Sequence, residues 1–234
     1  MIERGSRRYF GGRPYPFDME LVERRDGTPL GELVRRHFAG VEAVVDAGCG
    51  YGRYTEILAE SAQAVIALDH SFACVTRTCN RVESALGICG NVSAIPLPSE
   101  SVDGVISLYT SIGLDGEDLS RQIGEFTRVT RSGGRLLLDV AAPGTVGFSF
   151  GAERIPWGVG LFLRIGGQAQ QLQINLAVSL SRVGVYRLLY ATYRAEDILT
   201  ALTPGWIIEQ TLGDYDGSPY SVDSARIIVS AQRS

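Results

Sequence analysis

The stretch Val41-Glu-Ala-Val-Val-Asp-Ala-Gly-Cys-Gly-Tyr-Gly-Arg-Tyr-Thr55 decides the fold of this chain. It opens with apolar and β-branched residues, which favour a buried strand. Three glycines then occupy alternate positions, and the apolar residues after them follow a helical spacing: Tyr54, Ile57 and Leu58. The stretch therefore predicts a strand, a tight glycine turn and a helix. Such a turn lies at the carboxyl end of a strand, where open α/β sheets bind ligands.

Three classes of ligand use a turn of this kind. A phosphate-binding loop requires a lysine after its glycines, and this chain contains no lysine. A dinucleotide fingerprint, G-x-G-x-x-G, requires a third glycine where this chain has Arg53 or Thr55. The spacing present is D-x-G-x-G-x-G, and it resembles the first motif of class I S-adenosylmethionine (SAM) methyltransferases. The resemblance implies that the cofactor contacts these residues: Asp46, Gly48, Cys49, Gly50 and Gly52. A turn that merely closes a strand–helix unit is the alternative.

Composition indicates an ordinary globular protein. The chain has 234 residues, of which 45% are hydrophobic and 21% charged, and this suits one domain. The net charge of −4 and the pI of about 5.3 argue against a nucleic-acid partner, because phosphate contacts need clustered positive charge. The N-terminal arginines are interpreted as part of a solvated arm: Arg4, Arg7, Arg8 and Arg13.

The cysteines indicate neither disulfides nor a metal. Cys49, Cys74, Cys79 and Cys89 form no C-x-x-C pair, and no histidine spacing completes a zinc site. We expect reduced thiols, no metal and a cytoplasmic location. No apolar run approaches the length of a membrane span, and the first residues lack the apolar core of a signal peptide.

A second acidic position supports a nucleoside ligand. Residues 64–69 predict a buried strand that ends at Asp69. In a βαβ unit an acid at this place lies beside the ribose, where a carboxylate accepts from both hydroxyls. An acid there can also simply cap the next helix. His70 follows, and we expect it to lie against the adenine face; a catalytic role and an idle surface histidine are the alternatives.

Residues 90–108 strengthen the resemblance. Small-molecule SAM methyltransferases carry G-D-x-x-x-L-P-x-x-x-x-x-F-D-x-V here, and this chain matches it at Gly90, Pro96, Asp103 and Val105. Asn91 replaces the acid and Val102 the aromatic residue. The resemblance implies that the Asn91 side chain and the Val92 backbone contact the adenine. It also implies that the next strand ends at the cofactor and substrate, with Leu108 on the cofactor and Tyr109 on the substrate.

Two later segments also resemble the family. Residues 128–136 are similar to R-V-L-x-P-G-G-x-L, which predicts a helix end and a glycine turn before a strand at 136–140. Residues 213–220 resemble the G-D-[FY]-D-G-x-P-[YF] hairpin that ends many such enzymes.

Two segments are covered only by architectural analogy. Strict alternation at 172–180 predicts a half-buried antiparallel strand, with similar neighbours at 161–165 and 183–192. We therefore expect a β insertion at 145–192 over the substrate site, with Trp157 and Arg154 as candidate contacts. The arm at 1–28 is rich in aromatic residues, so we expect it to pack on the sheet edge or to close over the ligands. In the second case Tyr15 would contact the cofactor and Tyr9 the substrate.

The sequence thus predicts a single α/β domain over 1–234: a doubly wound, Rossmann-like, seven-stranded methyltransferase sheet with an antiparallel β insertion. Its parts are an arm and helix at 1–40, a cofactor-binding core at 41–144, the insertion at 145–192, and a helix and strand hairpin at 193–234. The expected activity is SAM-dependent methyl transfer to an oxygen or nitrogen of a small molecule, mainly by proximity and orientation, in a monomer or homodimer. No catalytic base is assigned. A nucleic-acid or protein methyltransferase and a non-catalytic SAM-binding protein are the alternatives.

Overall fold

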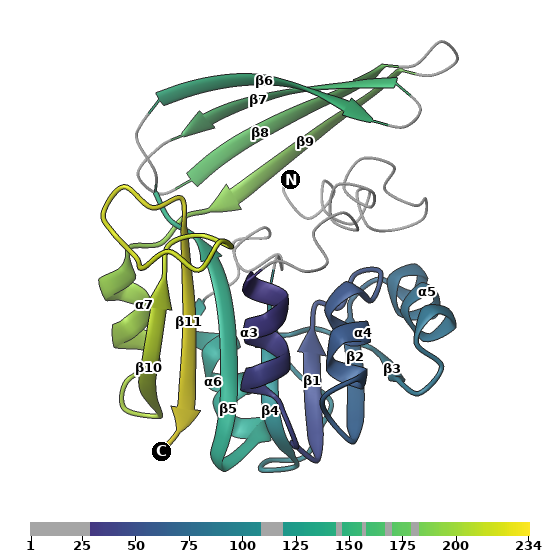
Figure 1. The fold of residues 1–234 in the computed structure, drawn as a ribbon, viewed down its shortest axis with the longest axis vertical. Helices are drawn as coiled ribbons and strands as arrows, with labels where there is room; N and C mark the ends of the chain where they lie inside the picture. Colours follow the sequence, from purple (N-terminus) through teal and green to yellow (C-terminus); the bar gives the residue numbers. More distant parts are fainter. Residues whose placement is uncertain (1–28, 109–118, 144–146, 156–157, 167–169, 179–182) are drawn as a thin grey trace.

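The computed structural model describes residues 29–108, 119–143, 147–155, 158–166, 170–178 and 183–234. Its centre is a seven-stranded sheet with the strand order β10-β11-β5-β4-β1-β2-β3 (Figure 1). Only β11 runs antiparallel to its neighbours in this sheet, β5 and β10. The doubly wound fold predicted from the sequence is confirmed.

The first half of the sheet is built from βα units. β1 (Ala43–Ala47) leads through the glycine turn into α4 (Arg53–Ala59), and β2 (Ala64–Asp69) pairs with β1 in parallel. α5 (Phe72–Arg81) then leads to β3 (Leu86–Cys89) at the sheet edge. Ser71 begins α5 as its N-cap, because its Oγ accepts from the backbone N–H of Cys74. The carboxyl ends of β1 and β2 therefore lie side by side.

The second half continues in the order that the family resemblance implies. β4 (Val102–Ser107) is followed by α6 (Leu119–Val129) and β5 (Thr130–Ala141), and the chain ends with α7 (Ala195–Leu202), β10 (Trp206–Leu212) and β11 (Arg226–Arg233). β5 begins earlier than the predicted 136–140. Its first residues already pair with β4, through a register shift between Val102 and Gly104. Gly133 accommodates this irregular start with a φ of 79°.

Helices cover both faces of the sheet (Figure 1). α3 (Pro29–His37) and α4 pack on one face, and α6 and α7 pack on the other. The apolar residues that α3, its C-terminal neighbour and α4 turn toward the sheet are all buried: Leu30, Leu33, Val34, Phe38, Tyr54, Ile57 and Leu58. Phe126 of α6 and Ile198 of α7 are fully buried against the opposite face. The sheet is therefore shielded from water on both sides, as a parallel sheet requires.

A second sheet interrupts the fold between β5 and α7. Its strands form an antiparallel meander: β6 (Gly147–Ile155), β7 (Gly158–Gly166), β8 (Gln170–Val178) and β9 (Val183–Ala191). Figure 1 places it beyond the end of the main sheet toward which the β1 and β5 arrows point. The predicted antiparallel insertion is confirmed, and its role over a substrate site stays a prediction. Among the described residues no helix is long and apolar enough to span a bilayer.

Candidate functional site

The glycine turn after β1 is held against the end of β2. The backbone N–H groups of Gly48 and Cys49 both donate to Leu68 O, at 2.7 and 3.0 Å. Gly48, Gly50 and Gly52 have φ angles of 85°, 54° and 85°, a region that residues with a side chain rarely adopt. The chain can therefore turn sharply from β1 into α4 only because glycines occupy these positions.

Two of the glycines serve different purposes. A Cβ added to Gly52 would lie 2.9 Å from Thr78 Cγ2, so this glycine allows α5 to pack against the turn. Among the residues that the structure describes, a Cβ added to Gly50 would meet nothing within 4 Å. Thr78 also donates from Oγ1 to Gly50 O at 2.9 Å, which fixes the turn from the side of α5. The backbone at Gly50 thus borders open space that a ligand can approach.

Asp69 faces the turn from the end of β2. Its Oδ2 accepts from the backbone N–H of Gly50 at 3.1 Å, and its Oδ1 accepts from that of Ser71 at 2.8 Å. The residue is 7% exposed, and burial raises the pKa of its carboxyl group. His70 Nδ1 lies 3.5 Å from Asp69 Oδ1, and the His70 side chain is 39% exposed. The strand-end acid is therefore oriented by the glycine turn itself.

A second acid lies beneath the turn. Asp46, at 3% exposure, accepts from Thr55 Oγ1 at 2.6 Å, and Thr55 is fully buried. Burial raises the Asp46 pKa to about 7, and the nearby charge of Asp69 adds to the effect. Burial also raises the pKa of Cys49, so its thiol stays protonated. Cys49 therefore fills space in the turn as a small side chain and is not a nucleophile.

The loop after β3 approaches the same edge of the sheet. The Gly90 backbone N–H donates to Asp69 O at 2.9 Å. Asn91 Oδ1 accepts from the Ser93 backbone N–H at 2.7 Å, and Asn91 O accepts from the Ala94 N–H at 3.0 Å. Asn91 itself is exposed and Val92 half-buried. The loop thus makes a tight turn whose first residues lie next to the end of β2.

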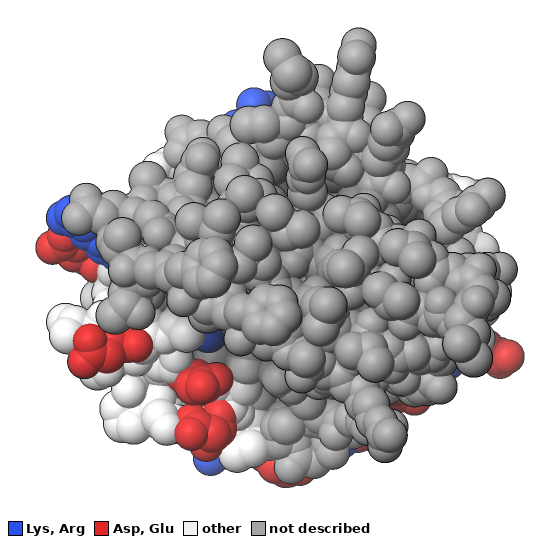
Figure 2. Space-filling model, turned by 90° about the horizontal axis from the view of Figure 1, so that it is seen from above, with Lys and Arg blue, Asp and Glu red and all other residues white. Residues whose placement is uncertain are grey.

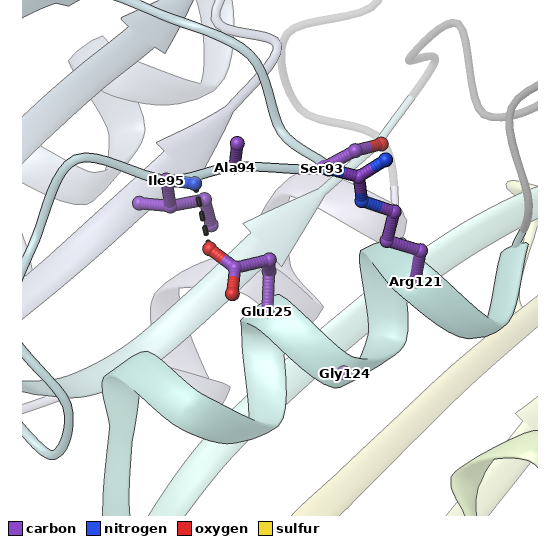
Figure 3. Close-up of a pocket in the computed structure, with 6 residues that line it drawn as sticks. All are labelled: Ser93, Ala94, Ile95, Arg121, Gly124 and Glu125. Carbon is purple, nitrogen blue, oxygen red and sulfur yellow. Dashed lines mark hydrogen bonds between the residues drawn. The ribbon is translucent and has the colours of Figure 1, made fainter.

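A pocket of about 500 Å³ lies on the far side of this loop, between the loop and α6 (Figure 3). Its wall is formed by residues of both segments: Ser93, Ala94, Ile95, Arg121, Gly124 and Glu125. Figure 3 shows the Arg121 side chain extending toward Ser93 and that of Glu125 toward Ile95. The pocket adjoins the loop that carries Asn91 and does not include the glycine turn.

The structure brings together the predicted cofactor residues that it describes. Gly48, Cys49, Gly50 and Gly52 form the turn, Asp46 and Asp69 flank it, and His70, Asn91 and Val92 lie at the next strand ends. Leu108 follows β4 and is 4% exposed. The remaining candidates lie outside the described residues, or have a side chain that is not described: Tyr9, Tyr15, Tyr109, Arg154 and Trp157. The described residues contain no cluster of three or more metal-ligating side chains.

Sequence reasoning missed three residues that shape the site. Ser71 donates its backbone N–H to Asp69. It could have been predicted from the sequence, because a serine just before a helical pattern is a typical N-cap. Thr55 and Thr78 hold Asp46 and Gly50 by their hydroxyl groups. No local pattern predicts these two contacts, because they depend on how α4 and α5 pack on the turn.

Two acidic side chains lie beside the turn. Asp46 and Asp69 are both buried there, so any charge that they carry is negative and disfavours a pyrophosphate. Figure 2 views the molecule from the side of β6–β9; on the described surface visible there, acidic side chains form several patches and arginines fewer. No continuous basic patch is visible on that described part. The site and the fold together are those of a doubly wound protein with a glycine turn and a strand-end acid at the ligand edge of its sheet.

Comparison with known proteins agrees with this description. Residues 45–138 match the family model described as "Methyltransferase domain". A malonyl-[acyl-carrier protein] O-methyltransferase of Yersinia pestis is 31% identical over 126 residues, which cover 53% of this chain and 45% of the relative. These matches support the resemblance to class I SAM-dependent methyltransferases that the glycine turn and residues 90–105 carry. The chain matches somewhat less than half the length of these curated relatives.

Solved structures show the same fold over nearly the whole chain. The SAM-bound amino pentose methyltransferase CalS10 from Micromonospora echinaspora has a TM-score of 0.71 at 16% identity, covering 95% of this chain and 99% of its own. The sugar N-methyltransferase KedS8 from a Streptoalloteichus species has a TM-score of 0.68 at 20% identity, covering 95% of both chains. At these identities the likeness establishes the fold.

Proposed function

We propose that this protein transfers the methyl group of SAM to an oxygen or nitrogen atom of a small molecule. The observation that carries the proposal is the glycine turn, open at Gly50 and faced by the buried, doubly hydrogen-bonded carboxylate of Asp69. The similarity to an O-methyltransferase and to a sugar N-methyltransferase supports both acceptor atoms. A net charge of −4 and a pI of about 5.3 favour a small acceptor over a nucleic acid.

The residues of the site fit the cofactor. Asp69 keeps acceptor capacity for the ribose hydroxyls beyond its two backbone contacts. A cationic ligand beside Asp46 and Asp69 would favour their ionised forms and offset the cost of burying those charges. Asn91 and Val92 at the next strand end supply a side-chain amide and a backbone N–H to a base. When bound, SAM supplies an electrophilic methyl group on a positively charged sulfur.

The chain's own contribution is binding and orientation. Holding an acceptor in line with a fixed methyl group can contribute roughly 7–11 kcal/mol, so a neutral amine needs no base. A hydroxyl acceptor gains typically 10²–10⁴-fold from a general base. His70 lies against Asp69 at the cofactor side and is not placed as such a base. Its expected role is to contact the adenine face.

Calorimetry and thermal unfolding test the cofactor. SAM and S-adenosylhomocysteine should bind and raise the melting temperature, with a gain of about 2.7 kcal/mol at 100 times Kd, and NAD should not. Equal shifts with NAD would contradict the proposal.

Turnover is tested with acceptor panels. S-adenosylhomocysteine formation should appear with amino sugars, other amines, hydroxyl compounds or small carboxylates. Binding without turnover on any acceptor would favour the non-catalytic alternative, and turnover on RNA or protein alone would favour a macromolecular substrate.

A further inference from the structure

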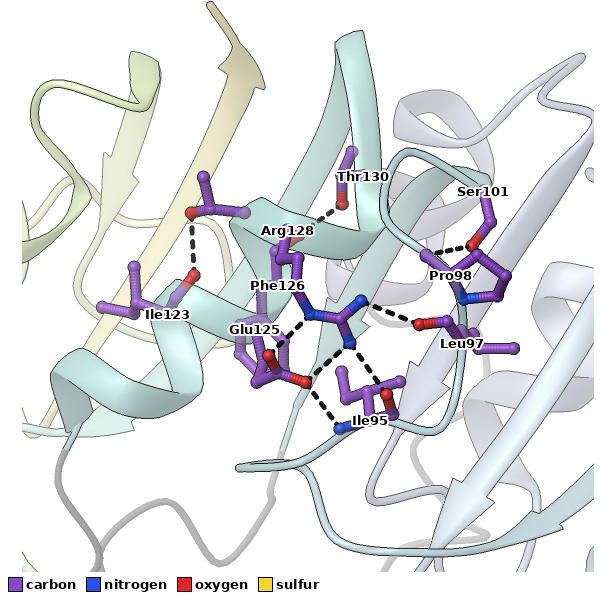
Figure 4. Close-up of polar contacts among 10 residues, drawn as sticks. Ile95, Leu97, Pro98, Ser101, Ile123, Glu125, Phe126, Arg128 and Thr130 are labelled. Carbon is purple, nitrogen blue, oxygen red and sulfur yellow. Dashed lines mark hydrogen bonds and ion pairs between the residues drawn. The ribbon is translucent and has the colours of Figure 1, made fainter.

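Two residues of α6 hold the loop after β3 in place (Figure 4). Arg128 donates from Nη1 to Leu97 O and from Nη2 to Ile95 O, both at 2.8 Å. Glu125 Oε2 accepts from the Ile95 backbone N–H at 2.7 Å. The two side chains also pair with each other, from Arg128 Nε to Glu125 Oε1 at 2.7 Å. One ion pair thus binds the amide of Ile95 and the carbonyls of both Ile95 and Leu97.

These contacts cross the edge of the pocket between the loop and α6. The pocket between the loop and α6 lies directly under Ser93, Ala94 and Ile95, and Gly124 contributes no side chain to fill it. The Ile95 side chain is buried in the core, but the backbone of the loop meets α6 through Glu125 and Arg128 (Figures 3 and 4). Charge-assisted hydrogen bonds are stronger than neutral ones and more directional. The polar pair therefore restrains the height of the loop backbone over the helix, in addition to the buried Ile95 side chain.

The restraint reaches the residues that face the cofactor. Asn91 is joined to Ser93 through its side chain and to Ala94 through its carbonyl. The segment from Asn91 to Ile95 is consequently one tight turn, fixed at its far end by Glu125 and at its near end by the Gly90 contact with Asp69. A displacement at Ile95 shifts Asn91 and Val92.

We propose that Glu125 and Arg128 are positioning residues that hold Asn91 and Val92 in the arrangement that distinguishes the purine of the cofactor. The proposal rests on the proposed SAM site. The Asn91 amide oxygen accepts from Ser93 with one lone pair and keeps a second for the amino group of adenine, while the Val92 backbone N–H is the donor for N1. Hypoxanthine reverses both groups, because its N1 carries a hydrogen and its O6 is an acceptor.

Base selectivity measures this role separately from general stability. The probes are S-adenosylhomocysteine and S-inosylhomocysteine, and calorimetry gives the Kd of each for the full chain. The wild type should bind the adenine compound at least about tenfold more tightly, the equivalent of roughly one net hydrogen bond. Arg128→Met should weaken the adenine compound about tenfold, leave the hypoxanthine compound within about threefold, and so remove most of the selectivity. Arg128→Lys keeps the charge but cannot reach both carbonyls, and should be intermediate.

A matched control lies at the other end of the same loop. Arg131 pairs with Asp103 at 2.7 Å and donates to the carbonyls of Glu100 and Ser101, both at 3.1 Å. Arg131→Met removes an equivalent set of contacts far from Asn91, and should leave the selectivity unchanged. Should Arg128→Met not fold, Glu125→Gln supports the same comparison, because it weakens the pair and keeps an acceptor for Ile95.

Any other result of this binding comparison would contradict the inference. Equal weakening of both compounds, or no weakening, would make the pair a brace of the fold alone. A wild type that binds both compounds equally would show that the loop does not distinguish the base, while SAM binding itself would leave the proposed function intact. Absence of any S-adenosylhomocysteine binding would remove the proposed function as well.

Discussion

Tyr215 donates its phenolic hydroxyl to Asp139 Oδ2 at 2.8 Å, joining the C-terminal hairpin to the carboxyl end of β5. Asp139 is 1% exposed and also accepts from Arg226 Nε at 2.7 Å. The Arg226 guanidinium lies over the Tyr215 ring, 5.4 Å from its centroid. The three residues form one network that holds residues 213–225 at the ligand edge of the sheet.

Tyr215 and Arg226 should contribute unequally to the unfolding free energy of the protein. Tyr215→Phe removes one hydrogen bond to a charged group and should cost about 1.5–3 kcal/mol of unfolding free energy. Arg226→Met leaves a buried carboxylate without its charge partner and should cost about 3–5 kcal/mol. Urea unfolding measures both. Glu196→Gln, at the exposed Arg194 pair, is the control and should change nothing measurable; equal costs at Tyr215 and Arg226 would contradict the network.

Asp69 should be essential for cofactor binding and less important for the fold. Asp69→Asn keeps an acceptor for one backbone N–H but loses the charge and one acceptor for the ribose, so SAM should bind at least about tenfold more weakly. Calorimetry gives the affinity, and far-UV circular dichroism should show an intact fold. Asp103→Asn is the matched control: Asp103 also accepts from a backbone N–H, that of Ala43 at 2.9 Å, but lies at the opposite end of the sheet. An unchanged SAM affinity in Asp69→Asn would remove Asp69 from the site.

The two glycines of the turn should respond differently to alanine. Gly52→Ala places a Cβ against Thr78 at a φ of 85°, and should destabilise the protein by more than the roughly 1–2 kcal/mol of a left-handed alanine. Gly50→Ala, at a φ of 54° and with no described residue within 4 Å of the new Cβ, should cost about 1–2 kcal/mol at most. Because its methyl group enters the open space beside Asp69, it should weaken SAM binding more than it weakens the fold. Denaturation and calorimetry on each variant give the two quantities.

A second substitution tests the contact itself. Thr78→Ser removes Cγ2 and keeps the hydroxyl that donates to Gly50 O. Combined with Gly52→Ala it should recover part of the lost stability, while combined with Gly50→Ala it should recover none. Equal recovery in both pairs would show that the contact with Thr78 is not the source of the strain.

The parts of the site that could be predicted from the sequence are those encoded locally. The glycines and Asp69 follow strands whose apolar character is evident, and parallel strands bring their carboxyl ends together. Thr78 contacts Gly50 across 28 positions, and Arg128 contacts Leu97 across 31. The sequence motif includes Arg128 but does not predict its contacts, because its partners are backbone carbonyl groups, which every residue has. The early start of β5 was missed for a similar reason: glycines at 133 and 134 normally end a strand pattern.

Stability should fall as pH rises through the range in which Asp46 titrates. The pKa of Asp46 is about 7 in the folded protein, against 3.8 for the free side chain, because the carboxyl group is buried. Between these values the folded state holds a proton that the unfolded state has released. Asp46 therefore contributes a decrease in unfolding free energy of about 1.4 kcal/mol per pH unit from roughly pH 4 to pH 7, and no further change above that range.

Asp46→Asn isolates this contribution, because an asparagine is neutral at every pH and still accepts from Thr55. The His37 pKa is lowered by burial, so His37 acts in the opposite sense: the unfolded state holds its proton more tightly, and its contribution to stability rises with pH below the ordinary histidine pKa of 6.5. The difference between Asp46→Asn and the wild type cancels this effect and should increase steadily in favour of the variant from pH 5 to pH 7. Urea unfolding at several pH values measures it. If the difference in unfolding free energy between the two proteins stayed constant from pH 5 to pH 7, Asp46 would be charged over that whole range. A partner other than Thr55 would then have to stabilise the buried charge.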